Sequence, residues 1–251
     1  MGRLTPRLIL SAMQQISLVS GDAKPLRRVC SMHVLALVTQ KGGTGKSSLA
    51  VSLAVAALES GLKAAIVDID PQGTASEWHD RRRAAAPEVA RLHWSYLSSQ
   101  LHAFERNGHD LVLIDTPGAD DSAAAAAIRE ANLCLLPLRP SIADVEAMKP
   151  TLKYLSDRNK PFTFVLNQCP AGGRTSRTSN AFRALQLIGG VCDVTVALRS
   201  DHMDALAAGL GVTEHAPAGK AAAEVRQVLD WVLTRKTRGE DAVVRRADSA
   251  A

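Results

Sequence analysis

The residues best suited to chemistry form a glycine-rich loop between an apolar, strand-like run and an apolar, helix-like run. The loop reads QKGGTGKSS over residues 40–48, and the apolar run after it covers residues 49–58. Glycines allow backbone N–H groups to converge on phosphate oxygens, and the start of a helix adds the positive end of its dipole. Lys46 would bring a positive charge to β- and γ-phosphates, and the Ser47 hydroxyl suits Mg²⁺. The loop predicts a phosphate-binding site, whose expected residues are Lys41, Gly42, Gly43, Thr44, Gly45, Lys46, Ser47 and Ser48.

Acidic residues end two further apolar runs. Residues 66–73 read IVDIDPQG, and residues 111–118 read LVLIDTPG. In a parallel sheet, ligands bind at the carboxyl ends of the strands, where Asp70 and Asp115 would join the phosphate loop. Asp115 is expected to hold a water molecule bound to the Mg²⁺ that the loop residue Ser47 coordinates.

Apolar runs alternate with helix-like stretches at the spacing of right-handed βαβ units. This alternation predicts an α/β fold with one mostly parallel β-sheet and helices on both faces. The expected strands are 33–39, 63–69, 91–96, 110–115, 132–137, 161–167 and 191–198. The expected helices are 46–60, 75–86, 97–107, 121–130, 142–158, 178–188 and 218–236. No repeat or low-complexity segment divides this series, which indicates one domain.

The composition of the 251-residue chain excludes several other classes of protein. Aromatic residues make up 4 % of it, which favours helices packed on a parallel sheet over a β-sandwich. No apolar run approaches the ~18–20 residues that span a bilayer. The four cysteines have no metal-ligand spacing, so we expect them to be small core residues rather than ligands.

The net charge of +5 is concentrated near the N-terminus. Residues 1–31 carry +4, residues 237–251 balance to zero, and the body over residues 32–236 carries +1. We expect a flexible basic extension at 1–31, with Met32 as an alternative start of the protein, and a disordered tail at 237–251. A body with so little charge can bind nucleic acid through a local patch or by doubling its charge in a dimer.

The phosphate loop departs from the standard pattern G-x-x-x-x-G-K-[ST], because Gln40 replaces the first glycine and Lys41 follows it. The resulting K-G-G-x-G-K-S arrangement resembles the deviant Walker A motif of the ParA/MinD superfamily. Residues 66–73 resemble its switch I block, and residues 111–118 resemble its Walker B and switch II block. Residues 136–144, which read LPLRPSIAD, resemble its I-P-x-x-P-S-x-x-D segment.

The resemblance covers residues 32–236 and is closest to the small, plasmid-type ParA partition proteins, which lack an N-terminal DNA-reading domain. It implies a P-loop NTPase fold, binding of ATP and Mg²⁺, and ATPase activity that is slow until a partner stimulates it. In this family the first loop lysine, here Lys41, reaches the nucleotide of the partner subunit across an ATP-dependent sandwich dimer. Asp70 matches the residue that orients the attacking water, and Asn167 matches the asparagine that hydrogen-bonds adenine. The implied catalytic residues are Asp70, Lys41 and Lys46.

The implied function is that of a ParA-type ATPase that binds DNA non-specifically and drives partition or positioning of a plasmid, a chromosome or a protein cargo. Such a protein works in the cytoplasm on the nucleoid, with a ParB-like protein or a cargo adaptor as its activator. Arg199 and Lys220 fall near the family's DNA-binding basic residues, and Arg226 would extend that patch. The alternative is a MinD-like membrane-surface ATPase. The helix at 218–236 does not favour it, because its small apolar residues suit core packing rather than a membrane anchor.

Two smaller questions stay open at this level. Asp68 is either a second acidic residue of the site or a structural cap or salt-bridge partner. His79 with residues 81–83 is either a DNA or partner contact or a solvated helix face.

Overall fold

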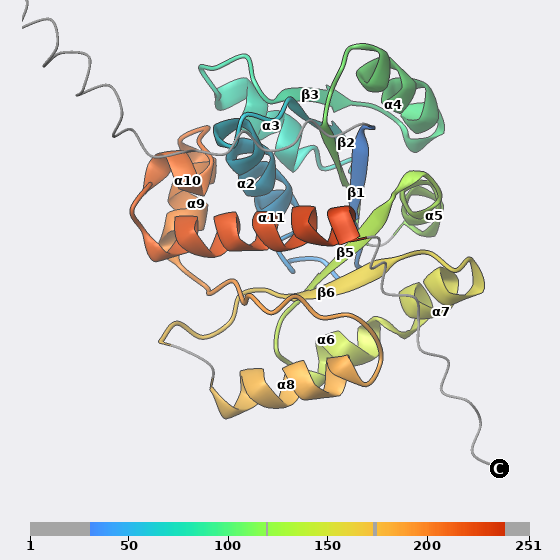
Figure 1. The fold of residues 1–251 in the computed structure, drawn as a ribbon, viewed down its shortest axis with the longest axis vertical. Coiled ribbons are helices and arrows are strands. Elements are labelled where there is room, and N and C mark those ends of the chain that lie inside the picture. The colour runs from blue at the N-terminus through green and yellow to red at the C-terminus, as the bar shows by residue number, and fades with distance from the viewer. Residues whose placement is uncertain (1–30, 119, 173–174, 239–251) are drawn as a thin grey trace, which may run out of the picture.

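Six parallel strands form the central sheet of the computed structural model, which describes residues 31–118, 120–172 and 175–238. The strand order is β3-β2-β4-β1-β5-β6 (Figure 1). The strands are β1 (His33–Leu37), β2 (Ala64–Asp68), β3 (Glu88–Arg91), β4 (Leu111–Asp115), β5 (Leu133–Leu138) and β6 (Phe162–Leu166). Every pairing between them is parallel. The predicted α/β fold with a mostly parallel sheet is confirmed.

Helices cover both faces of this sheet and divide the hydrophobic core into two layers (Figure 1). In β1, Leu35 and Leu37 belong to one layer, and Val34 and Ala36 belong to the other, because successive side chains point to opposite faces. The first layer contains α2 (Lys46–Glu59), α3 (Thr74–Arg81), α9 (Ser200–Ala207), α10 (Val212–His215) and α11 (Lys220–Arg238). The second layer contains α4 (Leu97–Arg106), α5 (Asp121–Glu130), α7 (Lys149–Asp157) and α8 (Ser176–Gln186).

The carboxyl ends of the strands meet at one edge of the sheet, where residues distant in sequence come together. The chain winds to one side of β1 through β2 and β3, and to the other side through β5 and β6. Open α/β sheets bind ligands where the winding direction reverses in this way. The phosphate loop follows β1 and therefore lies at that point.

One predicted strand, 191–198, is an extended segment with two isolated bridges, Phe164–Val191 and Cys169–Ala197. The backbone N–H groups of Cys192 and Val196 donate to carbonyls of β6, whereas the N–H of Ala197 donates to Glu224 of α11. Cys134, Cys169 and Cys192 are buried, as expected, whereas Cys30 lies outside the described residues.

The other differences concern one divided helix, one misplaced strand and two short helices. The predicted helix 142–158 is divided at Met148 into α6 (Ile142–Ala147) and α7, because Pro150 in the first turn of α7 has no N–H to continue α6. The predicted strand 91–96 is the end of β3 followed by a 3₁₀-helix at Trp94–Tyr96. The short helices α9 and α10 were not predicted.

The expected extension and tail lie almost wholly outside the described residues, and α11 continues to Arg238. Within the part of the chain that the structure describes, none of the helices has the length and hydropathy that crossing a membrane requires.

Candidate active site

A cleft of about 640 Å³ opens at the carboxyl edge of the sheet. It is lined by Gln40, Gly42, Gly43, Gly45, Lys46, Ser47, Ser48, Asp70, Pro71, Gln72, Thr74, Pro117, Gly118 and Asp120. The structure thus brings together most of the predicted phosphate loop, Asp70 and the loop after β4. Lys41 and Asn167 are not among the lining residues.

The phosphate loop is fixed by two amide side chains from the loop after β6. Asn167 Nδ2 donates to the Thr44 carbonyl over 2.8 Å, and Gln168 Nε2 donates to the Gly43 carbonyl over 3.0 Å. Gly45 has φ +85°, and a Cβ there would lie 2.5 Å from Asn167 Nδ2. Glycine is therefore required both by the left-handed backbone and by the close approach of Asn167.

The ammonium group of Lys46 is buried with weak partners. Its Nζ lies 3.3 Å from Thr39 Oγ1 and 3.4 Å from the Lys41 carbonyl. Burial lowers the pKa of Lys46, and the negative charges of Asp115 and Asp70 oppose that shift. A phosphate group in the cleft would supply the directly bound anionic partner that this ammonium lacks among the described residues.

Asp115 is fully buried at the end of β4, and neither carboxylate oxygen has a partner in good hydrogen-bonding geometry among the described residues. Burial, with the nearby charges of Asp68 and Asp70, raises the pKa of Asp115 to about 7, although Ser47 and Lys46 act against that rise. A buried carboxylate without a partner beside a serine hydroxyl fits a divalent cation with oxygen ligands. Ser47 and Asp115 are therefore the residues that fit Mg²⁺.

The two acidic residues after β2 have different environments. Asp68 is fully buried, and its carboxylate accepts hydrogen bonds from the backbone N–H of Asp70 and from the N–H and hydroxyl of Ser76. Asp68 is thus a structural residue that joins β2 to α3. Asp70 is half-buried, lines the cleft, and accepts a hydrogen bond from the Gln72 N–H over 2.9 Å.

Lys41 forms an ion pair at the edge of the site. Its Nζ lies 2.5 Å from Asp144 Oδ1, and Arg139 binds the same carboxylate through Nε at 2.8 Å. Burial alone would raise the pKa of Asp144, but hydrogen bonds from Arg139 and Lys41 hold it well below its usual range. Lys41 thus contacts a carboxylate of its own chain rather than the cleft.

Residues 35–236 match the family model described as the CobQ/CobB/MinD/ParA nucleotide binding domain. The chain belongs to this family. The resemblance predicted from the phosphate loop is therefore confirmed, and with it the family's P-loop nucleotide-binding fold.

Three known proteins illustrate what the chain is similar to. It is 28 % identical to Protein IncC of Escherichia coli over 256 residues, which covers 82 % of this chain and 70 % of IncC. It is 40 % identical to the Maintenance of carboxysome distribution protein A of Gloeobacter kilaueensis over 122 residues, covering 48 % of this chain and 55 % of that protein. The solved structure of apo McdA from Cyanothece has a TM-score of 0.66 at 16 % identity, and covers 80 % of this chain and 99 % of that one.

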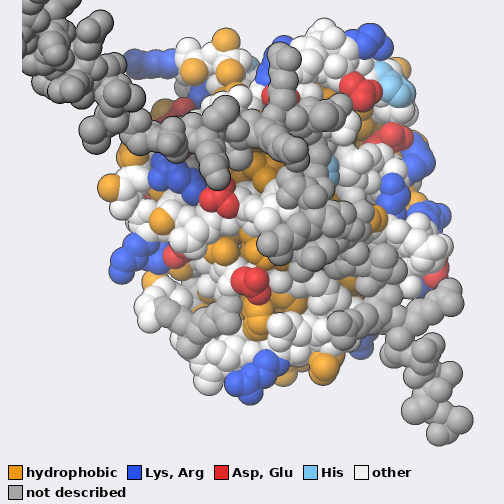
Figure 2. All heavy atoms as spheres, viewed as in Figure 1, with side chains coloured by type: hydrophobic (Ala, Val, Ile, Leu, Met, Phe, Trp, Pro, Cys, Tyr) orange, Lys and Arg blue, Asp and Glu red, His pale blue; other side chains and the backbone are white. Residues whose placement is uncertain are grey.

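The basic residues predicted to contact DNA differ in their surroundings. Arg199 forms an ion pair with Glu224 at 2.7 Å, and Arg226 forms one with Glu59 at 3.0 Å. Lys220 is exposed at the start of α11, and its side chain makes no hydrogen bond or ion pair with the described residues. On the face that α11 crosses, Lys and Arg side chains are spread mostly around the rim, and Asp and Glu side chains lie both among them and nearer the middle (Figure 2).

The basic cluster at the end of α3 also has structural roles. Arg82 pairs with Glu214 of α10 at 2.7 Å and stacks over Trp78 at 5.1 Å from the ring centroid. Arg81 donates to the carbonyl of Leu206 in α9. The sequence analysis offered a DNA or partner contact, or a solvated helix face, for residues 81–83. Arg82 has a different role, because it connects α3 to α10.

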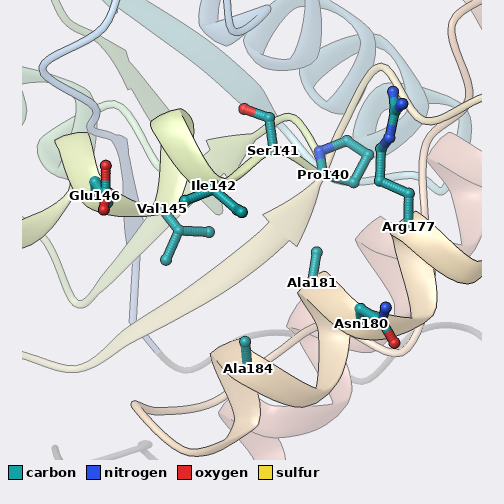
Figure 3. Close-up of a pocket in the computed structure, with 9 residues that line it drawn as sticks. All are labelled: Pro140, Ser141, Ile142, Val145, Glu146, Arg177, Asn180, Ala181 and Ala184. Carbon is teal, nitrogen blue, oxygen red and sulfur yellow. The ribbon is translucent and has the colours of Figure 1, made fainter.

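An apolar groove of about 600 Å³ lies between α6 and α8, outside the cleft (Figure 3). It is lined by Pro140, Ser141, Ile142, Val145, Glu146, Arg177, Asn180, Ala181 and Ala184. Ile142 is 80 % exposed there. Arg177 also lines the hollow that contains Lys41 and Asp144, so the groove and this ion pair are neighbours.

Three residues at the family site were missed from the sequence. Arg139 lies inside the block LPLRPSIAD, and Gln168 directly follows Asn167, so both had a signal in their position. Arg91, whose guanidinium contacts the loop after β2, had none.

Proposed function

We propose that this chain is a ParA-type ATPase that dimerises when it binds ATP, binds DNA without sequence preference and positions a cargo. The cargo is a plasmid, a chromosome or a protein assembly, and the protein works in the cytoplasm on the nucleoid. A ParB-like protein or a cargo adaptor stimulates hydrolysis and releases the dimer from DNA. Family membership and the likeness to IncC support a nucleotide-driven process. The name of the Gloeobacter relative, which refers to carboxysome distribution, supports positioning as its purpose.

Each residue of the cleft would have a separate role in ATP hydrolysis. The phosphate loop and Lys46 would bind the phosphates, and Ser47 with Asp115, through water, would hold Mg²⁺. The bound ion supplies positive charge against the developing charge on the phosphate oxygens. Asp70 would orient the attacking water from the wall of the cleft, and Asn167, next to the phosphate loop, would contact the base.

The ion pair of Lys41 is the observation that best supports the proposed dimer. Lys41 follows the loop residue Gln40 in sequence, yet its Nζ contacts Asp144 and the residue does not line its own cleft. A lysine that served its own nucleotide would be expected among the cleft residues. Its position outside them favours a role toward the nucleotide of a second subunit.

Dimerisation would also explain how a nearly neutral body binds DNA. Two subunits present each exposed lysine twice, and affinity for DNA rises steeply with the number of phosphates neutralised. Lys220 is the strongest candidate among the three basic residues, because Arg199 and Arg226 are already paired with glutamates.

The proposal is tested by the binding of the full chain to DNA fragments of unrelated sequence with ATP, with ADP and without nucleotide. We expect the protein to bind DNA only when ATP is present, whatever the DNA sequence. This binding should weaken steeply between about 50 and 200 mM salt. Equal affinity under all three nucleotide conditions would contradict the proposal. Binding to anionic vesicles in place of DNA would favour the MinD-like alternative.

A further inference from the structure

The guanidinium group of Arg91 lies against the turn that carries Asp70. Arg91 ends β3, the edge strand, and its Nη2 donates to the Pro71 carbonyl over 2.8 Å. A Cβ placed on Gly73 would lie 2.6 Å from Arg91 Cζ and 2.8 Å from both terminal nitrogens. The guanidinium therefore occupies the space that the missing side chain of Gly73 leaves free.

This turn sets the direction of the Asp70 carboxylate. The Gly73 N–H donates to the Asp70 carbonyl over 2.9 Å, and the Gln72 N–H donates to Asp70 Oδ1 over 2.9 Å. On the core side, the Asp68 carboxylate accepts the Asp70 N–H over 3.1 Å. Arg91 contacts the same turn from the exposed side, through the Pro71 carbonyl.

We propose that Arg91 is a positioning residue for ATP hydrolysis, which holds the turn 70–73 so that the Asp70 carboxylate faces the attacking water. The inference rests on the proposed ATPase function of Asp70. Arg91 is exposed and does not line the cleft, so it acts through the turn and leaves the binding of ATP to the phosphate loop. Loss of Arg91 should therefore lower the rate of hydrolysis at saturating ATP, because the water must be oriented in the transition state.

The test compares Arg91→Ala with Arg83→Ala, which removes an exposed arginine that has no hydrogen bond or ion pair with the described residues. The full chain is assayed for kcat, for the Kd of ATP and for Tm. We expect Arg91→Ala to lower kcat about three- to tenfold, the size expected for the loss of one hydrogen bond. The Kd and the Tm should stay at the wild-type values, Arg83→Ala should match the wild type in all three, and Arg91→Lys, which keeps a donor, should recover part of kcat.

A double-mutant cycle with Gly73→Ala separates positioning from general stability. The added methyl group would displace the guanidinium in the wild-type background, but not where Arg91 is already alanine. The backbone strain of alanine at φ +67° is the same in both backgrounds and cancels in the cycle. We therefore expect Gly73→Ala to lower kcat further in the wild type than in Arg91→Ala.

Two results would overturn the inference while leaving the proposed function intact. In the first, the wild type is active and Arg91→Ala leaves kcat unchanged. In the second, Arg91→Ala lowers Tm together with kcat, so that the lower kcat reflects lost stability. A wild type that binds ATP but never hydrolyses it, with or without DNA, would overturn the proposed function and the inference together.

Discussion

Lys41 and Asp144, 103 residues apart in sequence, form an ion pair beside the nucleotide cleft, with Lys41 Nζ 2.5 Å from Asp144 Oδ1. The carboxylate is buried, and Arg139 binds it as well. If Lys41 reaches the nucleotide of a second subunit, it must first leave this carboxylate. The ion pair with Arg139 means that Asp144 keeps a cationic partner when Lys41 departs, so its charge is never buried alone.

The free energy of unfolding should depend on pH through Asp144. Its native pKa lies well below the usual ~3.9, so the ionised form stabilises the fold above about pH 4, and this contribution is lost as the pH falls further. Asp144→Asn should therefore lose about 1.5–3 kcal/mol at pH 7, and less at pH 3. Urea unfolding at both pH values measures this, with Asp157→Asn on the exposed end of α7 as the control. A loss of equal size at both pH values would show that the charge of Asp144 is not responsible.

Lys46→Met should separate ATP binding from stability. Without its ammonium the loop loses its charged contact to phosphate, so ATP affinity should fall by about 100-fold or more in calorimetric titrations. The apo protein should be as stable as the wild type or more stable, because the variant removes a desolvated charge whose partners lie at 3.3 and 3.4 Å. Lys149→Met, at an exposed lysine of α7, is the matched control. Wild-type ATP affinity in Lys46→Met would remove this lysine from the site.

Asp70→Ala should bind ATP and dimerise without hydrolysing it. The carboxylate lines the cleft, and positioned acidic groups typically contribute at least about 100-fold to such a step. Phosphate release at saturating ATP measures the effect, and Asp80→Ala, an exposed acidic residue of α3, should retain wild-type turnover. Normal turnover in Asp70→Ala would take the catalytic role away from this residue.

Lys220→Glu should weaken DNA binding without affecting ATP binding. Lys220 is exposed and unpaired among the described residues, so reversing its charge breaks no internal contact, unlike reversal at Arg199 or Arg226. A dimer loses two such lysines, and the slope of log affinity against log salt should fall by about 1.8. Lys153→Glu in α7 makes the same charge change at another exposed site. The same loss of DNA affinity in both variants would indicate a non-local charge effect.

The sequence predicted those features that depend on short-range patterns. The buried strands are continuous apolar runs because helices cover both faces of the sheet, and the phosphate loop is a contiguous motif between a strand and a helix. The fold and the family followed from these two signals. The extended segment 191–198 shows their limit, because an apolar run does not reveal whether its backbone will form a continuous ladder or only isolated bridges with its neighbour.

Contacts between distant segments were not predictable in this way. Asn167 was expected at the base of the nucleotide, and its amide holds the Thr44 carbonyl 123 residues away. Arg91 is one of many arginines in the sequence, and its contact with Pro71 depends on the pairing of β3 with β2. Such roles follow from the register of the sheet rather than from local sequence.

The mass of the protein in solution tests the central claim, an ATP-gated dimer that depends on Lys41, most directly. Light scattering with Mg²⁺ and a non-hydrolysable ATP analogue should give a dimer for the wild type and a nucleotide-bound monomer for Lys41→Ala. Both proteins should be monomers with ADP. A dimer of Lys41→Ala that forms at the same analogue concentration as the wild-type dimer would contradict the account.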